Sequence, residues 1–239
     1  MKIVFLCVDA QNDFMKKDGK LYIQNAEVIH KTIGDLTLMA EENDITVINT
    51  ADWHNKDSKE ISNDPDFIDT FPKHCMADTK GAEFILEANP MNPLVIPYDQ
   101  PLDNQKEDLL EFASEIIIQK DKFDVFEGNP HTERILELVN PDVVFVYGVA
   151  TNVCVDAAVM GLLKRNYNTY VVIDAIKELP NLLNQTVIKW ATNGVKYSAV
   201  NIPLPQHAQI TYNVMFNTYT EKEKIITKVD KFLKENINE

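Results

Sequence analysis

Apolar residues along this chain form short runs that alternate with segments of helical periodicity. The runs lie at residues 2–8, 45–50, 115–120, 143–147, 170–175 and 194–200. Between them, apolar positions recur every three or four residues at 25–42, 105–114, 131–139, 155–163 and 183–191. Continuous apolar runs are typical of strands buried on both faces, and β-α-β order implies right-handed crossovers. The pattern predicts an α/β fold with a mostly parallel central sheet.

Two segments differ from this alternation. Residues 94–97 are apolar but end in Pro97, which indicates an edge strand or a connection. Residues 219–236 are predicted to form an amphipathic helix that packs on the domain or on a second subunit. We therefore expect one domain over residues 1–205 and a C-terminal extension with one helix over 206–239.

Composition narrows the classes of partner. The 239 residues carry a formal net charge of −14, which disfavours nucleic acids and anionic membranes. No run approaches the roughly 20 apolar residues of a transmembrane helix, and the apolar N-terminal run lacks a signal-peptide cleavage site. Three widely spaced cysteines suggest neither a disulfide framework nor a structural zinc site. We expect a cytoplasmic protein whose partners are small molecules or further subunits.

Cys154 lies between the apolar run at 143–147 and the periodic segment at 155–163. This order places it at a helix N-terminus, where free N–H groups and the helix dipole favour a thiolate. Cys154 is therefore a candidate nucleophile. Taken alone, it could equally be a small hydrophobic residue of the core.

Two charged residues follow other predicted strands. Asp9 comes directly after the run at 2–8, and Lys120 closes the run at 115–120. The carboxyl ends of parallel strands meet at one edge of a sheet, where open α/β folds place their chemistry. There, Lys120 could favour the ionised states of Asp9 and Cys154. The alternatives are a turn or cap residue for Asp9 and a surface lysine for Lys120.

A metal site is suggested by Asp52 and His54, which follow the run at 45–50. Residues two apart in an extended segment point to the same side, so both side chains could bind one ion. His74 could supply a third ligand, and Glu60 a further oxygen from the acid-rich loop at 55–70. A hydrogen-bonded Asp52–His54 pair and a solvated Glu60 are the alternatives.

Taken together, these segments resemble the isochorismatase-like cysteine hydrolases, and within them the nicotinamidases. The resemblance covers about residues 1–200 and keeps the family's order. It rests on Asp9-Ala10-Gln11-Asn12-Asp13-Phe14, Ala51-Asp52-Trp53-His54, Phe71-Pro72-Lys73-His74-Cys75, Thr79-Lys80-Gly81-Ala82-Glu83, Lys120 with Phe126, and Gly148-Val149-Ala150-Thr151 leading to Cys154-Val155. One departure is Asn152, where many family members carry an acid.

The resemblance implies a three-layer α/β/α fold with a catalytic triad of Asp9, Lys120 and Cys154. It also implies a cis peptide between Val149 and Ala150, with the backbone N–H groups of Ala150 and Cys154 forming an oxyanion hole.

The implied reaction is hydrolysis of nicotinamide to nicotinate and ammonia through a cysteine thioester. One divalent metal would bind the pyridine nitrogen, held by Asp52, His54 and His74, with Glu60 as a tentative fourth ligand. Zinc is the expected metal, and iron and manganese also suit these ligands. The rings of Phe14, Phe71 and Phe126 would sandwich the substrate.

Two other functions remain open at this point. The triad could act on another small amide, a carbamoyl compound or a ureido acid. A catalytically silent member of the fold could serve as a binding module. In either case we expect a homo-oligomer and no nucleic-acid or membrane partner.

Overall fold

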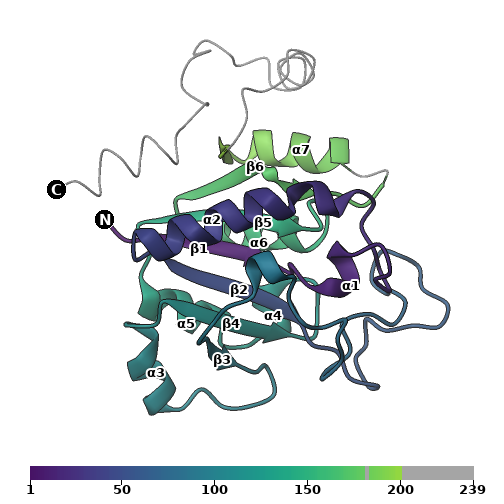
Figure 1. The fold of residues 1–239 in the computed structure, drawn as a ribbon, viewed down its shortest axis with the longest axis horizontal. Helices are drawn as coiled ribbons and strands as arrows, with labels where there is room; N and C mark the ends of the chain where they lie inside the picture. The colour runs from purple at the N-terminus through teal and green to yellow at the C-terminus, as the bar shows by residue number, and fades with distance from the viewer. Residues whose placement is uncertain (181–182, 201–239) are drawn as a thin grey trace, which may run out of the picture.

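A computed structural model describes residues 1–180 and 183–200 (Figure 1). The expected C-terminal extension, with its helix at 219–236, lies outside the described residues. Within them, no helix combines the length and the apolar character needed to cross a bilayer.

Seven strands form one sheet in the order β3-β4-β2-β1-β5-β6-β7, and every neighbouring pair is parallel. The strands are β1 Ile3–Val8, β2 Thr46–Asp52, β3 Leu94–Ile96, β4 Glu115–Lys120, β5 Val143–Val149, β6 Thr169–Lys177 and β7 Lys196–Ser198. The expected parallel sheet is confirmed, and the proline-terminated run at 94–96 is an edge strand.

Helices cover both faces of this sheet (Figure 1). They are α1 Asn12–Met15, α2 His30–Glu42, α3 Asn104–Leu110, α4 Val125–Gly128, α5 Thr132–Val139, α6 Cys154–Lys164 and α7 Leu183–Thr192, with 3-10 turns η1 Ala26–Ile29 and η2 Leu86–Ala88. Helix α2 packs on one face, and α5, α6 and α7 pack on the other. This is the three-layer α/β/α architecture.

Strand β1 shows why the sheet lies at the centre of the core. All six of its residues are buried. Ile3, Phe5 and Cys7 belong to the cluster that contains the α2 side chains, and the alternate residues belong to the cluster under α5 and α6. An uninterrupted apolar run is what a strand with two buried faces requires.

The chain reverses its direction of winding between β1 and β5, so their carboxyl ends define the crevice where such folds bind ligands. Gly148 lets the two strands approach closely there. Its φ is +114°, and a Cβ at this position would lie 2.0 Å from the carbonyl oxygen of Val8. A glycine is therefore required one residue before the predicted cis peptide and beside the strand that ends at Asp9.

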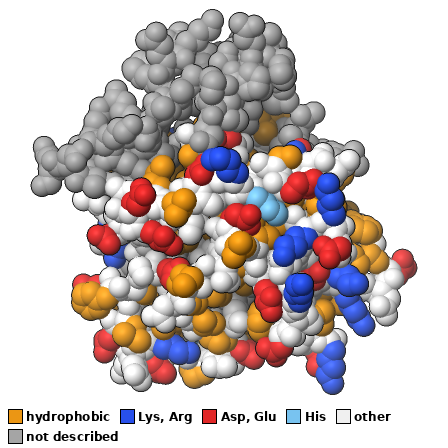
Figure 2. All heavy atoms as spheres, viewed as in Figure 1, with side chains coloured by type: hydrophobic (Ala, Val, Ile, Leu, Met, Phe, Trp, Pro, Cys, Tyr) orange, Lys and Arg blue, Asp and Glu red, His pale blue; other side chains and the backbone are white. Residues whose placement is uncertain are grey.

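On the face drawn in Figure 2, acidic, basic and hydrophobic side chains of the described residues are interspersed. This face shows no large patch of a single charge.

Candidate active site

The structure brings the three predicted reactive side chains together at the carboxyl edge of the sheet. Asp9 follows β1, Lys120 ends β4 and Cys154 begins α6. The Nζ of fully buried Lys120 lies 2.9 Å from Oδ2 of fully buried Asp9. The Cys154 Sγ and a carboxylate oxygen from each of Asp9 and Asp52 lie within 4.8 Å of one another.

A local turn fixes the direction of the Asp9 carboxylate. Asp9 has a φ of +48°, so the chain leaves β1 abruptly at this residue. Its N–H and its Oδ1 both contact the Thr50 hydroxyl, at 3.2 and 2.6 Å. The second oxygen, Oδ2, is left to face Lys120. The turn therefore directs Oδ1 of Asp9 toward the Thr50 hydroxyl, which holds the carboxylate in place, and Oδ2 toward the charge of Lys120.

The surroundings of Cys154 do not favour the ionised thiol that its place at a helix N-terminus suggested. Burial raises the pKa of Cys154 well above its usual value, and Lys120 opposes this rise only in part. Burial also raises the pKa of Asp9 in spite of the lysine. The helix N-terminus cannot offset the loss of water around a buried sulfur that also faces two carboxylates. A neutral thiol would need a base beside it, and a carboxylate oxygen of Asp9 lies within 4.8 Å of the Cys154 Sγ.

The peptide between Val149 and Ala150 is cis, as the resemblance implied. The Ala150 carbonyl accepts hydrogen bonds from the N–H groups of Val153 and Val155, at 3.0 and 3.1 Å. In residues 1–180 and 183–200, the N–H groups of Ala150 and Cys154 form no hydrogen bond. Both donors are therefore available to an oxyanion.

Three of the predicted metal ligands gather beside this triad. Ligand atoms of Asp52, His54 and His74 lie within 4.8 Å of one another, and all three side chains are buried. The His74 Nε2 lies 3.3 Å and the His54 Nε2 3.6 Å from Oδ2 of Asp52. A carboxylate with two imidazoles is a donor set that suits zinc, iron or manganese.

The hydrogen bonding of the two histidines fits a bound metal. Neither ring nitrogen of fully buried His54 has a hydrogen-bond partner among the described residues. Nδ1 of His74 lies 2.7 Å from the Pro72 carbonyl, which fixes the tautomer that leaves Nε2 free to coordinate. Buried polar atoms are rarely left unpaired, so a metal accounts for His54.

Asp52 belongs to both halves of the site. It lies directly opposite Lys120 in the β2–β4 register, and its Oδ1 pairs with the lysine Nζ. Burial alone would raise the pKa of Asp52, but the charge of Lys120 and the two neighbouring imidazoles hold it well below its usual value. One oxygen thus faces the catalytic lysine while the other faces the histidines.

Glu60 lies in the same pocket but outside the group of metal ligands. One of its carboxylate oxygens accepts a hydrogen bond from the Phe123 N–H at 2.9 Å. Burial raises the pKa of Glu60 to about 7. The alternative of a solvated loop acid is wrong, because the Glu60 side chain is 7% exposed. Its role as a metal ligand stays a prediction.

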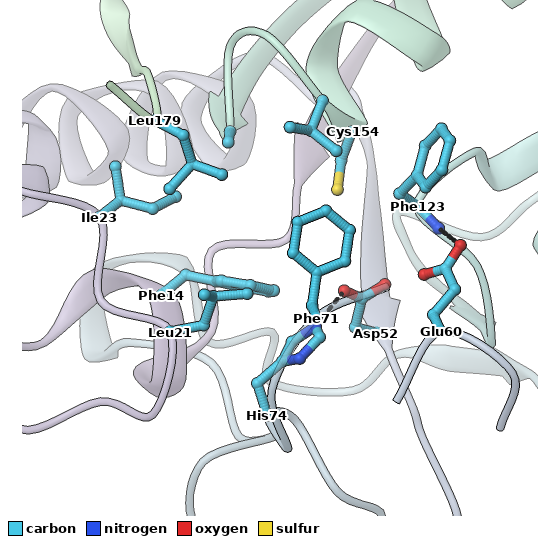
Figure 3. A pocket seen from close by; sticks show the side chains of 12 residues that line it. Phe14, Leu21, Ile23, Asp52, Glu60, Phe71, His74, Phe123, Cys154 and Leu179 are labelled. Carbon is cyan, nitrogen blue, oxygen red and sulfur yellow. Dashed lines mark hydrogen bonds and ion pairs between the residues drawn. The ribbon is translucent and has the colours of Figure 1, made fainter. Parts of the chain in front are cut away.

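A pocket connects these groups (Figure 3). It is lined by Phe14, Leu21, Ile23, Asp52, Glu60, Phe71, His74, Phe123, Ala150, Val153, Cys154 and Leu179. The rings of Phe14 and Phe71 line it as expected.

The prediction from the sequence that Phe126 lines this pocket is wrong. The Phe126 ring lies under the Arg165 guanidinium, 3.9 Å from the ring centroid, and against Gly161 of α6. Asp124 caps α4 by accepting from the Phe126 N–H, which turns this ring toward α6. Phe123 precedes the helix and lines the pocket in its place (Figure 3).

Two positioning residues were missed by the sequence analysis. Gln11 donates to the Asp52 carbonyl at 2.8 Å and accepts from the Asp52 N–H at 2.9 Å. Asp13 accepts from the N–H of Cys75, the residue after His74, at 2.8 Å. Both lie in a polar segment after β1, where nothing in the pattern separates a positioning residue from an ordinary turn residue.

We expect Gln11→Ala to weaken binding of Zn²⁺ by about tenfold, because the backbone of Asp52 loses both side-chain hydrogen bonds that orient it. Calorimetric titration of metal-free protein would measure this. Gln100→Ala, at an exposed glutamine, is the matched control and should bind Zn²⁺ normally. Equal affinity in the two variants would contradict the role of Gln11.

Comparisons with known proteins show which family this chain resembles. The isochorismatase domain family matches residues 95–198. The chain is 24% identical to the nicotinamidase of Saccharomyces cerevisiae over 211 residues, which is 75% of this chain and 91% of that protein.

Solved structures match over most of the chain. The pyrazinamidase of Pyrococcus horikoshii in complex with zinc is 23% identical with a TM-score of 0.65, covering 84% of this chain and 100% of that one. The N-carbamoylsarcosine amidase of Thermoplasma acidophilum is 22% identical with a TM-score of 0.65, and the match covers 85% of this chain and 99% of that one. At these identities the structures establish the fold.

The family match over residues 95–198, the relatives and the shared fold agree that the chain is similar to the isochorismatase-like hydrolases. The sequence-based expectations for family and fold are confirmed, and so is that of an enzyme of the amidohydrolase class. Within this class the chain is similar to the nicotinamidases.

Proposed function

We propose that this protein hydrolyses nicotinamide to nicotinate and ammonia. The observation that supports this most is that one pocket joins Cys154 to the metal-ligating group. Cys154 lies at one side of the pocket, and Asp52 and His74 lie across from it (Figure 3). A ring bound at the metal would present its carboxamide to the sulfur.

The first half-reaction would form a thioester. Asp9 takes the proton from the Cys154 thiol while the sulfur attacks the carboxamide carbon. The N–H groups of Ala150 and Cys154 donate to the oxygen on which negative charge develops. The C–N bond then breaks, and Asp9 returns the proton to the leaving nitrogen as ammonia departs.

The second half-reaction would regenerate the enzyme. Asp9, again ionised, takes a proton from water as the water oxygen attacks the thioester carbon. The C–S bond breaks, nicotinate is released, and Asp9 passes the proton to the sulfur. Lys120 stays protonated throughout, because the neighbouring Asp52 and Asp9 outweigh the effect of burial and hold its pKa well above the usual value.

A divalent metal, with zinc as the proposed ion, would be held by Asp52, His54 and His74 and would supply a Lewis acid for the pyridine nitrogen. Phe14 and Phe71 would contact the ring faces. Glu60 remains the proposed additional ligand.

The charge of the pocket favours a neutral amide over a carbamoyl or ureido acid. Of the described residues that line it, Asp52 and Glu60 are acids and none is a lysine or arginine. The nearby Lys120 is fully buried and is paired with Asp9 and Asp52. A substrate carboxylate would therefore face carboxylates, and apart from the proposed metal ion no cation among these lining residues would receive it.

The test is ammonia release from nicotinamide by purified protein, before and after metal is removed with a chelator. We expect turnover that falls at least about tenfold on chelation and returns with added Zn²⁺, because the ring loses its anchor. N-carbamoylsarcosine serves as the matched anionic amide and should be hydrolysed poorly. Faster hydrolysis of the anionic amide would overturn the proposal.

We also propose a pathway, a cellular location and a domain organisation for this protein. A nicotinamidase would act in NAD salvage in the cytoplasm as a homo-oligomer, with one catalytic domain over residues 1–205 and an extension over 206–239 that packs on the same domain or at a subunit interface. The silent binding module is disfavoured, because Asp9, Lys120 and Cys154 are all present and in mutual reach.

A further inference from the structure

The side chain of Asn152 holds the backbone of Leu179 through two hydrogen bonds. Its Oδ1 accepts from the Leu179 N–H at 2.9 Å, and its Nδ2 donates to the Leu179 carbonyl at 3.1 Å. Asn152 lies two residues before the nucleophile, and Leu179 lies two residues after the end of β6. This pair, which we call the Asn152 clamp, joins the nucleophile turn to a distant segment.

The clamp begins where the sheet ends. Pairing of β5 with β6 stops at Val149 and Lys177, and the Thr151 N–H then donates to the Lys177 carbonyl at 2.8 Å. Leu179 has left the sheet, yet its backbone is half-buried and needs hydrogen-bond partners. Asn152 supplies both of them from a single side chain.

The clamped residue is part of the pocket wall. The Leu179 side chain lies beside Ile23, on the side where Phe14 and Leu21 also lie, and Glu60 and Phe123 lie on the opposite side (Figure 3). Of the residues on this apolar side, Leu179 alone comes from the segment that follows β6. Its backbone is therefore held by β6 and by the clamp, whereas its side chain packs on the cluster that contains Phe14 and Ile23.

We propose that Asn152 is a positioning residue that fixes Leu179 as the size limit of the pocket, so that the enzyme prefers small, unsubstituted ring amides. This inference rests on the proposed function only in assuming that the substrate occupies this pocket. An amide side chain is required because both a donor and an acceptor are needed. An aspartate could accept from the Leu179 N–H, but it would set a second negative oxygen against the Leu179 carbonyl.

The first experiment compares Asn152→Asp and Leu179→Ala with the wild-type enzyme on nicotinamide and on nicotinamide that carries a ring methyl group. For both variants we expect KM for nicotinamide to rise by about tenfold, the effect of losing one hydrogen bond or a packed side chain, with kcat within about threefold. The ratio of kcat/KM for the methylated to the plain amide should rise.

Asn193→Asp is the matched control. The Asn193 amide also donates to a backbone carbonyl, that of Lys189 in α7, at an exposed position away from the pocket. The same chemical change there should leave the kinetics unaltered. The double variant Asn152→Asp/Leu179→Ala should resemble Leu179→Ala alone, because the clamp acts through Leu179. Additive effects, or a loss confined to kcat, would overturn the proposal.

A second measurement does not depend on which amide is the substrate. Alkylation of Cys154 by iodoacetamide and by the bulkier N-phenylmaleimide can be followed by peptide mass spectrometry, since Cys7 and Cys75 are at most 1% exposed. Loosening the clamp should raise the maleimide rate relative to the iodoacetamide rate. An unchanged ratio overturns the clamp, whereas absent nicotinamide turnover overturns only the proposed function.

Discussion

Replacing Cys154 with alanine should lower kcat for nicotinamide by about 10⁴-fold or more, because Cys154 is the one thiol among the described residues that line the pocket. The fold should remain, since the change removes one sulfur atom from a buried position and should lower the free energy of unfolding by about 1 kcal/mol. Ammonia release and chemical denaturation would measure the two effects.

The control for this variant is Cys7→Ala. Cys7 lies in β1, the strand that ends at Asp9, and its side chain is 1% exposed in the core. The same substitution there should leave kcat nearly unchanged at a similar cost in stability. Comparable turnover by Cys154→Ala and Cys7→Ala would eliminate the covalent mechanism.

Replacing Lys120 with methionine should have the second largest effect. It leaves the Asp9 and Asp52 carboxylates buried together without a cation, and removal of one partner from a buried ion pair lowers stability by about 3–5 kcal/mol. Turnover should fall at least about 100-fold, because Asp9 would hold its proton and could not deprotonate the thiol.

This variant should also reverse the pH dependence of stability at the site, measured in metal-free protein. With Lys120 present, the pKa of Asp52 lies below its unfolded value, so Asp52 stabilises the fold above that value and loses this effect as pH falls. Without the lysine, burial would raise the pKa of Asp52. The variant would then keep its stability at low pH, where Asp52 is protonated, and lose stability as pH rises. Denaturation at pH 5 and pH 8 should show a smaller deficit at pH 5.

The matched control is Lys122→Met, two residues further along. Its ammonium is exposed and forms a 3.5 Å surface ion pair with Glu127. Such pairs contribute little, so stability should change by less than about 1 kcal/mol at either pH. A Lys120→Met enzyme as stable and active as this control would show that the buried cation is dispensable.

The sequence predicted the parts of the site that lie on regular elements. Asp9, Lys120 and Cys154 each stand where an apolar run ends or a periodic segment begins, and parallel strands place all such positions at one edge. The spacing of Asp52 and His54 worked in the same way. The pattern and the parallel order of the strands predicted where these residues lie, whereas their roles as triad and metal ligands came from the family resemblance.

Features that depend on tertiary contacts were not accessible in this way. The sequence analysis named Phe126 as a pocket residue, whereas Phe123 lines the pocket. The direction of each ring depends on the Asp124 cap after β4, which the sequence pattern does not report. The protonation of Cys154 depends on its burial, which no local pattern reports. The hydrogen bonds of Gln11 and Asn152 join residues 41 and 27 positions apart, so their partners are defined only by the fold.

Because Asp52 faces Lys120 with one oxygen and the histidines with the other, the chemistry of the thiol and the choice of metal cannot be redesigned independently. A library built to recruit a different ion should keep position 52 constant and diversify positions 54 and 74 instead. Any exchange at position 52 would alter the charge next to the lysine, and metal selectivity gained that way would be accompanied by a change in nucleophile reactivity.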